Sequence, residues 1–175
     1  MNTLTRITPA YEHTKAGNFL FNLCARWTEY VVNHRWLYYL LACTWGFIMT
    51  AIGLLVTLVL AIVRFFAPNA VVFAPYLWVY SISVGPQYWG GLELGLCFLR
   101  DHKSCGGQLD AHEFGHTFQN ALFGPLFIFL VWIPSACWYW SKSSKPYDSM
   151  WFEDSATQCG LYASKFLSNK EISEE

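Results

Sequence analysis

Residues 36–63 read WLYYLLACTWGFIMTAIGLLVTLVLAIV, a stretch without a single charged side chain that is bounded by Arg35 and Arg64. A helix needs about 20 predominantly apolar residues to cross the hydrocarbon core of a bilayer. We therefore predict a transmembrane helix over residues 36–63. Its excess length indicates tilt, or a start at the membrane interface. Small residues recur along it at helical spacing and predict a face that another helix can approach closely, namely Ala42, Gly46, Thr50, Gly53 and Thr57.

The composition of the whole chain agrees with a membrane protein. Hydrophobic residues make up 54% of the 175 residues and charged residues only 13%, against about 25% charged in soluble domains. Nine Trp and ten Tyr are typical of interfacial aromatic belts. The 11 Lys and Arg against 12 Asp and Glu give a net charge of −1, so we expect no nucleic-acid partner. Lipid is the expected solvent for part of the surface.

The remaining pattern predicts one membrane-embedded domain over residues 1–175 that is mainly α-helical. Residues 19–34 mix apolar and polar positions near helical spacing, which indicates an amphipathic helix at the membrane surface or a soluble helix packed on the rest. Residues 76–84 and 92–99 read YLWVYSISV and LELGLCFL. We expect these two runs, separated by Gly and Pro, to pair as a small β-hairpin over residues 76–99. A second span over residues 71–99 is disfavoured by its prolines and glycines and by Glu93.

The second half of the chain predicts two helices joined by a broken apolar segment. One helix begins near Leu109, and residues 121–140 follow it without a charge. Gly124-Pro125 and Pro134 interrupt this run, because proline removes a helix hydrogen bond and clashes with the preceding turn. A further helix is expected over residues 149–167. Of the six cysteines, only Cys97 and Cys105 are close enough in a loop to test as a disulfide.

Residues 112–116 read His-Glu-Phe-Gly-His, an H-E-x-x-H motif in a segment expected to be helical. Two His at i and i+4 project from one helical face, so both imidazoles can reach a single Zn²⁺. Glu113 lies about 100° around the helix, where it can reach a metal-bound water without ligating the metal. An accidental pair of histidines on a helix is the alternative. The pattern predicts His112 and His116 as metal ligands and Glu113 as a catalytic base.

A catalytic zinc needs a third protein ligand and an open position for water. Glu153 and Ala156 form E-x-x-A on the later helix, where the small Ala156 permits a close helix approach. We expect Glu153 to be the third ligand, with Asp154 and His102 as alternatives. His13 and His34 precede the apolar run and are expected on its far side.

HEFGHT followed by FEDSATQCG resembles the gluzincin-type membrane zinc metallopeptidases of the heat-shock zinc endopeptidase and CAAX-prenyl-protease kind. Their pattern is H-E-x-G-H and then E-x-x-A-D-x-x-G, and this chain has Thr157 in place of the Asp. WGGLELG at 89–95, HEFGH at 112–116 and YDSMWFE at 147–153 also resemble a group of small bacterial membrane proteins. The resemblance covers roughly residues 85–160. It implies a bacterial cytoplasmic membrane location and an edge strand, here near residues 92–99, that pairs with an extended substrate.

The topology of residues 121–140 decides whether this zinc site can form. A single crossing would place Glu153 and the two histidines on opposite sides of the membrane. We therefore predict that the segment bends and returns, so that the H-E-x-x-H helix packs on the E-x-x-A helix.

These features predict a membrane-embedded zinc metallopeptidase that hydrolyses a peptide or membrane-protein substrate with a metal-activated water. His112, His116 and Glu153 hold Zn²⁺, and Glu113 takes the proton of the water. Tyr147, Tyr162 and His102 are candidate donors to the oxyanion. One alternative is a non-catalytic membrane protein with a structural or regulatory zinc. Another is a helical membrane subunit without metal.

Overall fold

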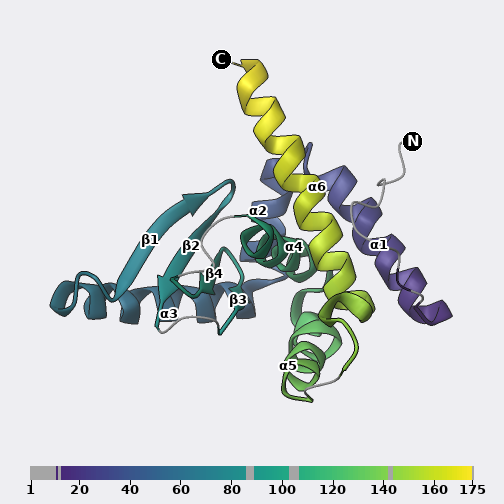
Figure 1. Cartoon of the computed structure of the whole chain (residues 1–175). Coiled ribbons are helices and arrows are strands. Elements are labelled where there is room, and N and C mark those ends of the chain that lie inside the picture. Colours follow the sequence, from purple (N-terminus) through teal and green to yellow (C-terminus); the bar gives the residue numbers. More distant parts are fainter. Residues whose placement is uncertain (1–10, 12, 86–88, 103–106, 142–143, 175) are drawn as a thin grey trace.

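The computed structural model describes the whole chain except residues 1–10, 12, 86–88, 103–106, 142–143 and 175. Cys105 lies outside the described residues, and with it the Cys97–Cys105 pairing. The described part is mainly helical and carries one small sheet of four strands (Figure 1).

The centre of the fold is a close crossing of two helices, α4 (Gln108–Phe123) and α6 (Trp151–Glu174) (Figure 1). Two glycines make this crossing possible. A Cβ added at Gly115 would overlap the carbonyl oxygen of Ala156, and one added at Gly160 would overlap that of Ala111. The two backbones are therefore in direct contact, as Ala156 in the sequence predicts.

The apolar stretch 36–63 does not form one helix, so the boundaries of the predicted span are wrong. It divides into α2 (Arg35–Cys43) and α3 (Phe47–Phe66) at residues 44–46. The break is held by tertiary contacts: the Trp45 indole donates to the carbonyl of Leu122 at 3.2 Å, and Gly46 packs against the Asn120 side chain. Ending the first helix at this point lets α2 pack on α4.

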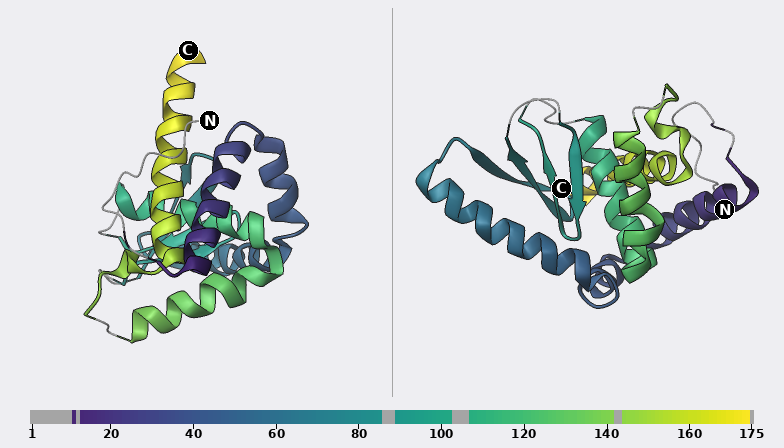
Figure 2. Two further views of the ribbon diagram at one scale, coloured as in Figure 1. Left: turned by 90° about the vertical axis from the view of Figure 1, so that its right-hand side faces the viewer. Right: turned by 90° about the horizontal axis from the view of Figure 1, so that it is seen from below.

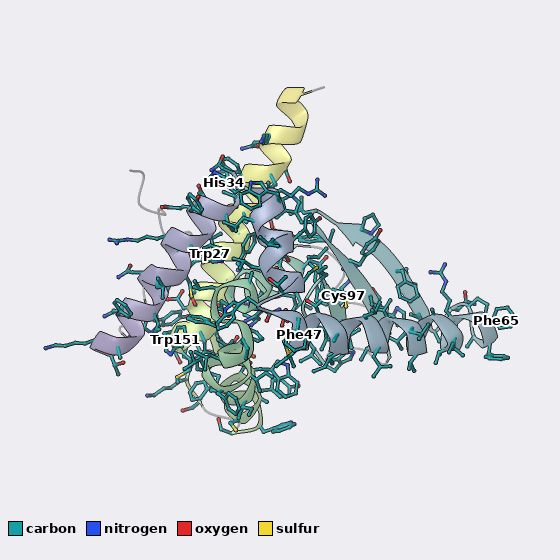
Figure 3. All side chains as sticks on the ribbon, turned by 180° about the vertical axis from the view of Figure 1, so that it is seen from behind. Trp27, His34, Phe47, Phe65, Cys97 and Trp151 are labelled. Carbon is teal, nitrogen blue, oxygen red and sulfur yellow. The ribbon has the colours of Figure 1, made fainter. Side chains whose placement is uncertain are left out.

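The second piece, α3, is the one described helix that is both long and apolar enough to cross a membrane. Its 20 residues correspond to about 30 Å of helix, the thickness of the hydrocarbon core. Only Met49 and Gly53 are buried. Figure 3 shows α3 leaving the helical body at Phe47 and running past Phe65 near its far end, with side chains standing free along its outer side.

The inner face of α3 packs on the sheet rather than on another helix. Gly53 lies against the carbonyl of Leu94, and Thr57 Oγ1 lies 3.6 Å from Cys97 Sγ. The stripe of small residues therefore permits the close approach that we expected, but a sheet is the neighbour. The view from below in Figure 2 shows the strands beside α3 and α4.

The sheet differs from the predicted hairpin. Its strands are β1 (Val71–Tyr76), β2 (Val79–Val84), β3 (Gly91–Leu94) and β4 (Cys97–Arg100), in the order β1-β2-β4-β3. β1–β2 and β3–β4 pair antiparallel, whereas β2–β4 pair parallel.

The predicted pairing of residues 76–84 with 92–99 as one hairpin is thus wrong, because each run contains a turn of its own. Tyr76 pairs with Val79 around a two-residue turn in which Leu77 has φ 51°. Leu94 pairs with Cys97 around Gly95, where φ is 75°. Positive φ at the turn is typical of two-residue hairpins, and at Leu77 no glycine marks it in the sequence.

The apolar segment after α4 is bent, as predicted. The helical stretch Gln108–Leu126 meets Ile128–Trp140 at 116°. Gly124, with φ 55°, and Pro125 form the corner. A short π-helical stretch, Ile128–Trp132, follows, and α5 (Ile133–Trp140) completes the segment. The chain then returns through the short 3₁₀ turn η3 (Tyr147–Ser149) to α6.

Helix α1 (Lys15–Val31) packs against α6 along a face that includes Phe21, Cys24 and Thr28. Of the two expectations for residues 19–34, packing on the rest of the protein is therefore seen for this face. The opposite face leaves Phe19 and Tyr30 exposed. Its position relative to a membrane surface stays a prediction.

Candidate metal centre

Helix α4 supplies His112, Glu113 and His116, and all three side chains are buried. Gly115 lies against the Ala156 carbonyl of α6, so that the crossing holds the motif in place. The N-terminal turn of α6 brings Glu153, which is fully buried, to the two imidazoles. The bend after Gly124 therefore does what the predicted site requires: it returns Glu153 to the histidine side.

Three ligand atoms converge at this point. Glu153 Oε2 lies 3.2 Å from His112 Nε2 and 3.3 Å from His116 Nε2, and the two Nε2 atoms lie 3.2 Å apart. Ligands bound tetrahedrally at 2.0–2.1 Å from a zinc ion are separated by about 3.3–3.4 Å. The triangle of His112, His116 and Glu153 thus has the dimensions of one face of a tetrahedral metal site, and the group can hold a metal ion.

Hydrogen bonds on the far side of each imidazole fix the ring nitrogens that face this point. His112 Nδ1 lies 2.7 Å from Thr157 Oγ1, whose hydroxyl donates to Asp148 Oδ1 at 3.2 Å. The Thr157 oxygen must then accept from His112. A neutral imidazole carries a proton on only one of its two nitrogens. Because Nδ1 of His112 carries it, Nε2 presents a lone pair.

His116 is fixed in the same way by a residue one turn along α4. His116 Nδ1 lies 2.7 Å from Gln119 Oε1. The amide of Gln119 is oriented by its Nε2, which donates to the Phe152 carbonyl and to Ser155 Oγ at 2.8 and 2.7 Å. His116 Nδ1 is consequently a donor, and the neutral ring also presents a lone pair at Nε2.

Two nitrogen lone pairs and a carboxylate therefore face one another at 3.2–3.3 Å. Neither oxygen of Glu153 has a hydrogen bond of its own. A buried carboxylate without partners is costly unless a cation compensates it. The donor set and its spacing fit a divalent metal ion.

The ionisation of the group reflects the same concentration of negative charge. Burial alone would raise the pKa of Glu153, but contacts with His112 and His116 outweigh it and hold that pKa far below its usual range. Burial would lower the pKa of His116, yet Glu153 and Glu113 raise it to about 9. A proton on His116 therefore compensates part of the negative charge of Glu153 and Glu113.

Glu113 lies beside the three converging atoms and is not one of them. Its carboxyl group packs against Gly91 of the edge strand β3, where any Cβ would overlap it. Burial raises the pKa of Glu113, and the two imidazoles only partly offset this effect. If a metal ion were held by the three converging groups, the Glu113 carboxylate would be placed to accept a proton from a water bound to that ion.

A cavity of about 710 Å³ opens onto the metal group. One wall is the start of β3, and the opposite wall is the bent segment with Val131, Trp132 and Ser135. Tyr147 closes one side, with its hydroxyl 3.0 Å from Ser135 Oγ and its ring centroid 6.0 Å from that of His112. Burial, together with the charge of Glu153, raises the pKa of Tyr147, so the phenol keeps its proton and can donate it in a hydrogen bond.

The other predicted candidates lie elsewhere. His102 Nε2 is 3.3 Å from the Ala70 carbonyl, and Asp154 Oδ2 is 2.9 Å from His13 Nε2. Tyr162 stacks on Phe166. The expectation that His13 lies on the far side of the apolar run is wrong. Helix α1 packs directly on α6, so His13, which precedes α1, lies against Asp154 of α6.

Four residues of the site were not predicted in the roles that they have. Gln119 could have been found, since it lies one helical turn after His116. Thr157 is a departure from the family pattern, and the sequence assigns it no role. Asp148 and Glu93 lie in the quoted stretches YDSMWFE and WGGLELG, but nothing in those stretches alone indicates that Asp148 contacts Thr157 or that Glu93 is buried on β3 and lines the cavity.

Comparison with protein-family models, curated proteins and solved structures finds no match to this chain.

Proposed function

We propose that the protein is a membrane-embedded zinc metallopeptidase that hydrolyses peptide bonds with a metal-activated water. The observation that carries this proposal is the triangle of His112 Nε2, His116 Nε2 and Glu153 Oε2, with Glu113 beside it and an open cavity in front. Two imidazoles and one carboxylate at tetrahedral spacing are the donor set of many catalytic zinc sites.

Zinc bound there supplies a water of lowered pKa and polarises the scissile carbonyl. Glu113 accepts the proton of that water, and it delivers the proton to the leaving amine as the peptide bond breaks. The position of Glu113 suits this double role, because its carboxyl group is buried beside the three converging ligand atoms and lines the cavity. The Tyr147 hydroxyl, on the cavity wall, donates to the carbonyl oxygen as negative charge develops on it.

The walls of the cavity suit a peptide chain. Among the described strands, the order places β3 at an edge of the sheet, and its residues Gly91–Glu93 line the cavity. An extended substrate adds to such an edge through backbone hydrogen bonds. The mainly apolar opposite wall fits the side chains of a membrane-protein segment.

The membrane location rests on α3. Leu54, Leu55 and Leu58 are 60–71% exposed on its outer side. Such a continuous apolar surface on a helix of spanning length is stable in lipid and unfavourable in water. The protein resembles bacterial membrane peptidases in its motifs, and we assign it to the cytoplasmic membrane.

The decisive experiment compares Glu113→Gln with wild type in detergent, measuring zinc per protein and cleavage of fluorescein-labelled casein. We expect Glu113→Gln to retain zinc and to lose about 10²–10⁴ in rate, because the amide keeps the shape but cannot accept a proton. His112→Ala and Glu153→Ala should lose the zinc itself. Glu29→Gln, the same change on α1 away from the metal group, is the matched control.

The outcomes separate this proposal from a non-catalytic zinc site. Stoichiometric zinc with no cleavage by wild type would favour the structural or regulatory site. Full activity in Glu113→Gln would remove the assigned mechanism. Wild type that binds no metal would remove both.

A further inference from the structure

We propose that Asp148 is a positioning residue for the metal centre, which orients His112 through the hydroxyl of Thr157. The inference rests on the proposed zinc site and concerns residues of this chain alone. It assigns a role to a carboxylate that lies outside both the H-E-x-x-H and the E-x-x-A segments.

The chain of hydrogen bonds has one direction. The Thr157 hydroxyl has a single proton, which it donates to Asp148 Oδ1 at 3.2 Å. Its oxygen is then free to accept the Nδ1 proton of His112 at 2.7 Å. Asp148 thereby determines which way the hydroxyl points, and the hydroxyl determines which nitrogen of His112 faces the metal position.

Asp148 is itself held in place by its neighbours on η3. The Trp138 indole donates to the Tyr147 carbonyl at 3.1 Å, and the Tyr147 hydroxyl meets Ser135 at 3.0 Å. Both contacts tie η3 to α5. The carboxylate is thus anchored from the bent apolar segment, whereas Thr157 belongs to α6.

The two imidazoles are therefore supported differently. His116 donates to a neutral amide, that of Gln119, whereas His112 donates to a hydroxyl polarised by a carboxylate. A carboxylate behind a ligating imidazole makes its other nitrogen a stronger ligand, and loss of such support costs about 10–100-fold in metal affinity. In this chain the carboxylate acts from Asp148 because position 157 holds a threonine.

The test is zinc affinity, measured by chelator competition on the full chain in detergent after metal removal and reloading. Asp148→Asn and Thr157→Val should each weaken zinc binding about 10–100-fold. Thr157→Ser keeps the hydroxyl and should stay near wild type. Asp154→Asn, the same change at a carboxylate that faces His13, is the matched control and should leave zinc affinity unchanged.

A rescue separates positioning from a general structural role. In the double variant Thr157→Asp with Asp148→Asn, a carboxylate reaches His112 directly, so zinc affinity should return to within a few-fold of wild type. Unfolding temperatures of the metal-free variants verify that all are folded before affinities are compared. Wild-type affinity in Asp148→Asn, or equal affinities in Thr157→Ser and Thr157→Val, overturns the inference.

The result is independent of the peptidase proposal. If wild type binds zinc but cleaves nothing, the affinity series still tests Asp148. If wild type binds no zinc, the proposed zinc site and this inference are both overturned.

Discussion

Helices α3 and α4 reverse the usual relation between composition and burial. In α3, apolar residues fill nearly every position, yet only Met49 and Gly53 of its 20 residues are buried. In α4, 13 of 16 residues are buried, and seven of these are polar or charged: Asp110, His112, Glu113, His116, Thr117, Gln119 and Asn120. A helix in a water-soluble protein shows the opposite pattern, with its apolar face inside.

This difference in burial indicates that the two helices have different roles. Buried polar groups are costly and persist where they are paired or where they have chemistry to perform. In α4, His112, His116 and Gln119 gather at the group that can hold a metal ion, with partners on α6, whereas Asp110 pairs with Arg100 of β4. An exposed apolar helix is costly in water, so α3 requires a different solvent or partner. The predictions below test these two statements, beginning with the largest effect.

The crossing of α4 and α6 is the feature on which the buried polar helix depends most. Gly160→Ala should abolish stable folding or cost at least about 3 kcal/mol, because the new Cβ overlaps the Ala111 carbonyl and backbone must move to relieve it. Separation of the helices also moves Glu153 away from the histidines, so zinc content falls as well. Thermal unfolding and zinc analysis check this, with Ser168→Ala on the exposed side of α6 as control. Unchanged stability and metal content in Gly160→Ala would contradict the observed crossing.

The exposed apolar helix should be sensitive to charge at its centre. Leu58→Lys places a charge in the middle of α3, on the outer face, and costs about 3 kcal/mol if that face lies in the hydrocarbon core. We expect a large fraction of this variant to be lost from carbonate-washed membranes. Phe65→Lys, at the end of the same helix, should have little effect, since a lysine there reaches the interface. Equal retention of both variants would contradict a bilayer-centred α3.

The sequence predicts the two helices unequally well. The H-E-x-x-H and E-x-x-A spacings correctly indicate that His112, His116 and Glu153 form a group that can hold a metal ion, since helical geometry fixes which side chains share a face. Gly124-Pro125 correctly indicates the bend, because both residues act locally. The break at residues 44–46 has no such local cause. It depends on Trp45 and Gly46 meeting α4, and only the folded chain brings these residues together.

Long-range pairing limits the rest of the prediction in the same way. The residue compositions of 76–84 and 92–99 correctly indicate β-structure, but the turn at Leu77 carries neither Gly nor Asn to reveal it. The parallel pairing of β2 with β4 cannot be read from either run alone. Asp148 joins the site through Thr157, a contact between segments that have no common spacing.

Metal affinity should rise with pH because His116 has to lose a proton. Its pKa of about 9 means that the metal-free side chain is protonated at neutral pH, and metal binding at Nε2 displaces that proton. We expect zinc affinity to increase about tenfold per pH unit from pH 7 and to level off near pH 9. Chelator competition over this range measures the slope, and NMR of the metal-free protein locates the His116 titration. A zinc affinity that does not change between pH 7 and 8.5 would contradict the assignment of His116 as a ligand whose proton the metal displaces.

The smallest effect concerns Glu93, the buried carboxyl group on β3 that faces α4. One of its oxygens accepts from the Gly95 amide at 2.6 Å, while the other has no partner. Burial raises the pKa of Glu93 to about 8 despite that bond. Between its unfolded value near 4.5 and this folded value, the folded chain keeps a proton that the unfolded chain releases. Rising pH therefore destabilises the folded state through this group.

Glu93→Gln removes that dependence, since its amide can still accept from Gly95 but does not titrate. Relative to wild type, the metal-free variant should gain about 1 kcal/mol of stability between pH 5 and pH 6, below the range in which most histidines titrate. Denaturant unfolding at the two pH values gives the difference directly. If wild type and Glu93→Gln change in parallel over this interval, Glu93 is ionised in the folded protein. The positive charge of His116 on α4, which lowers the pKa of Glu93, then outweighs the effect of burial.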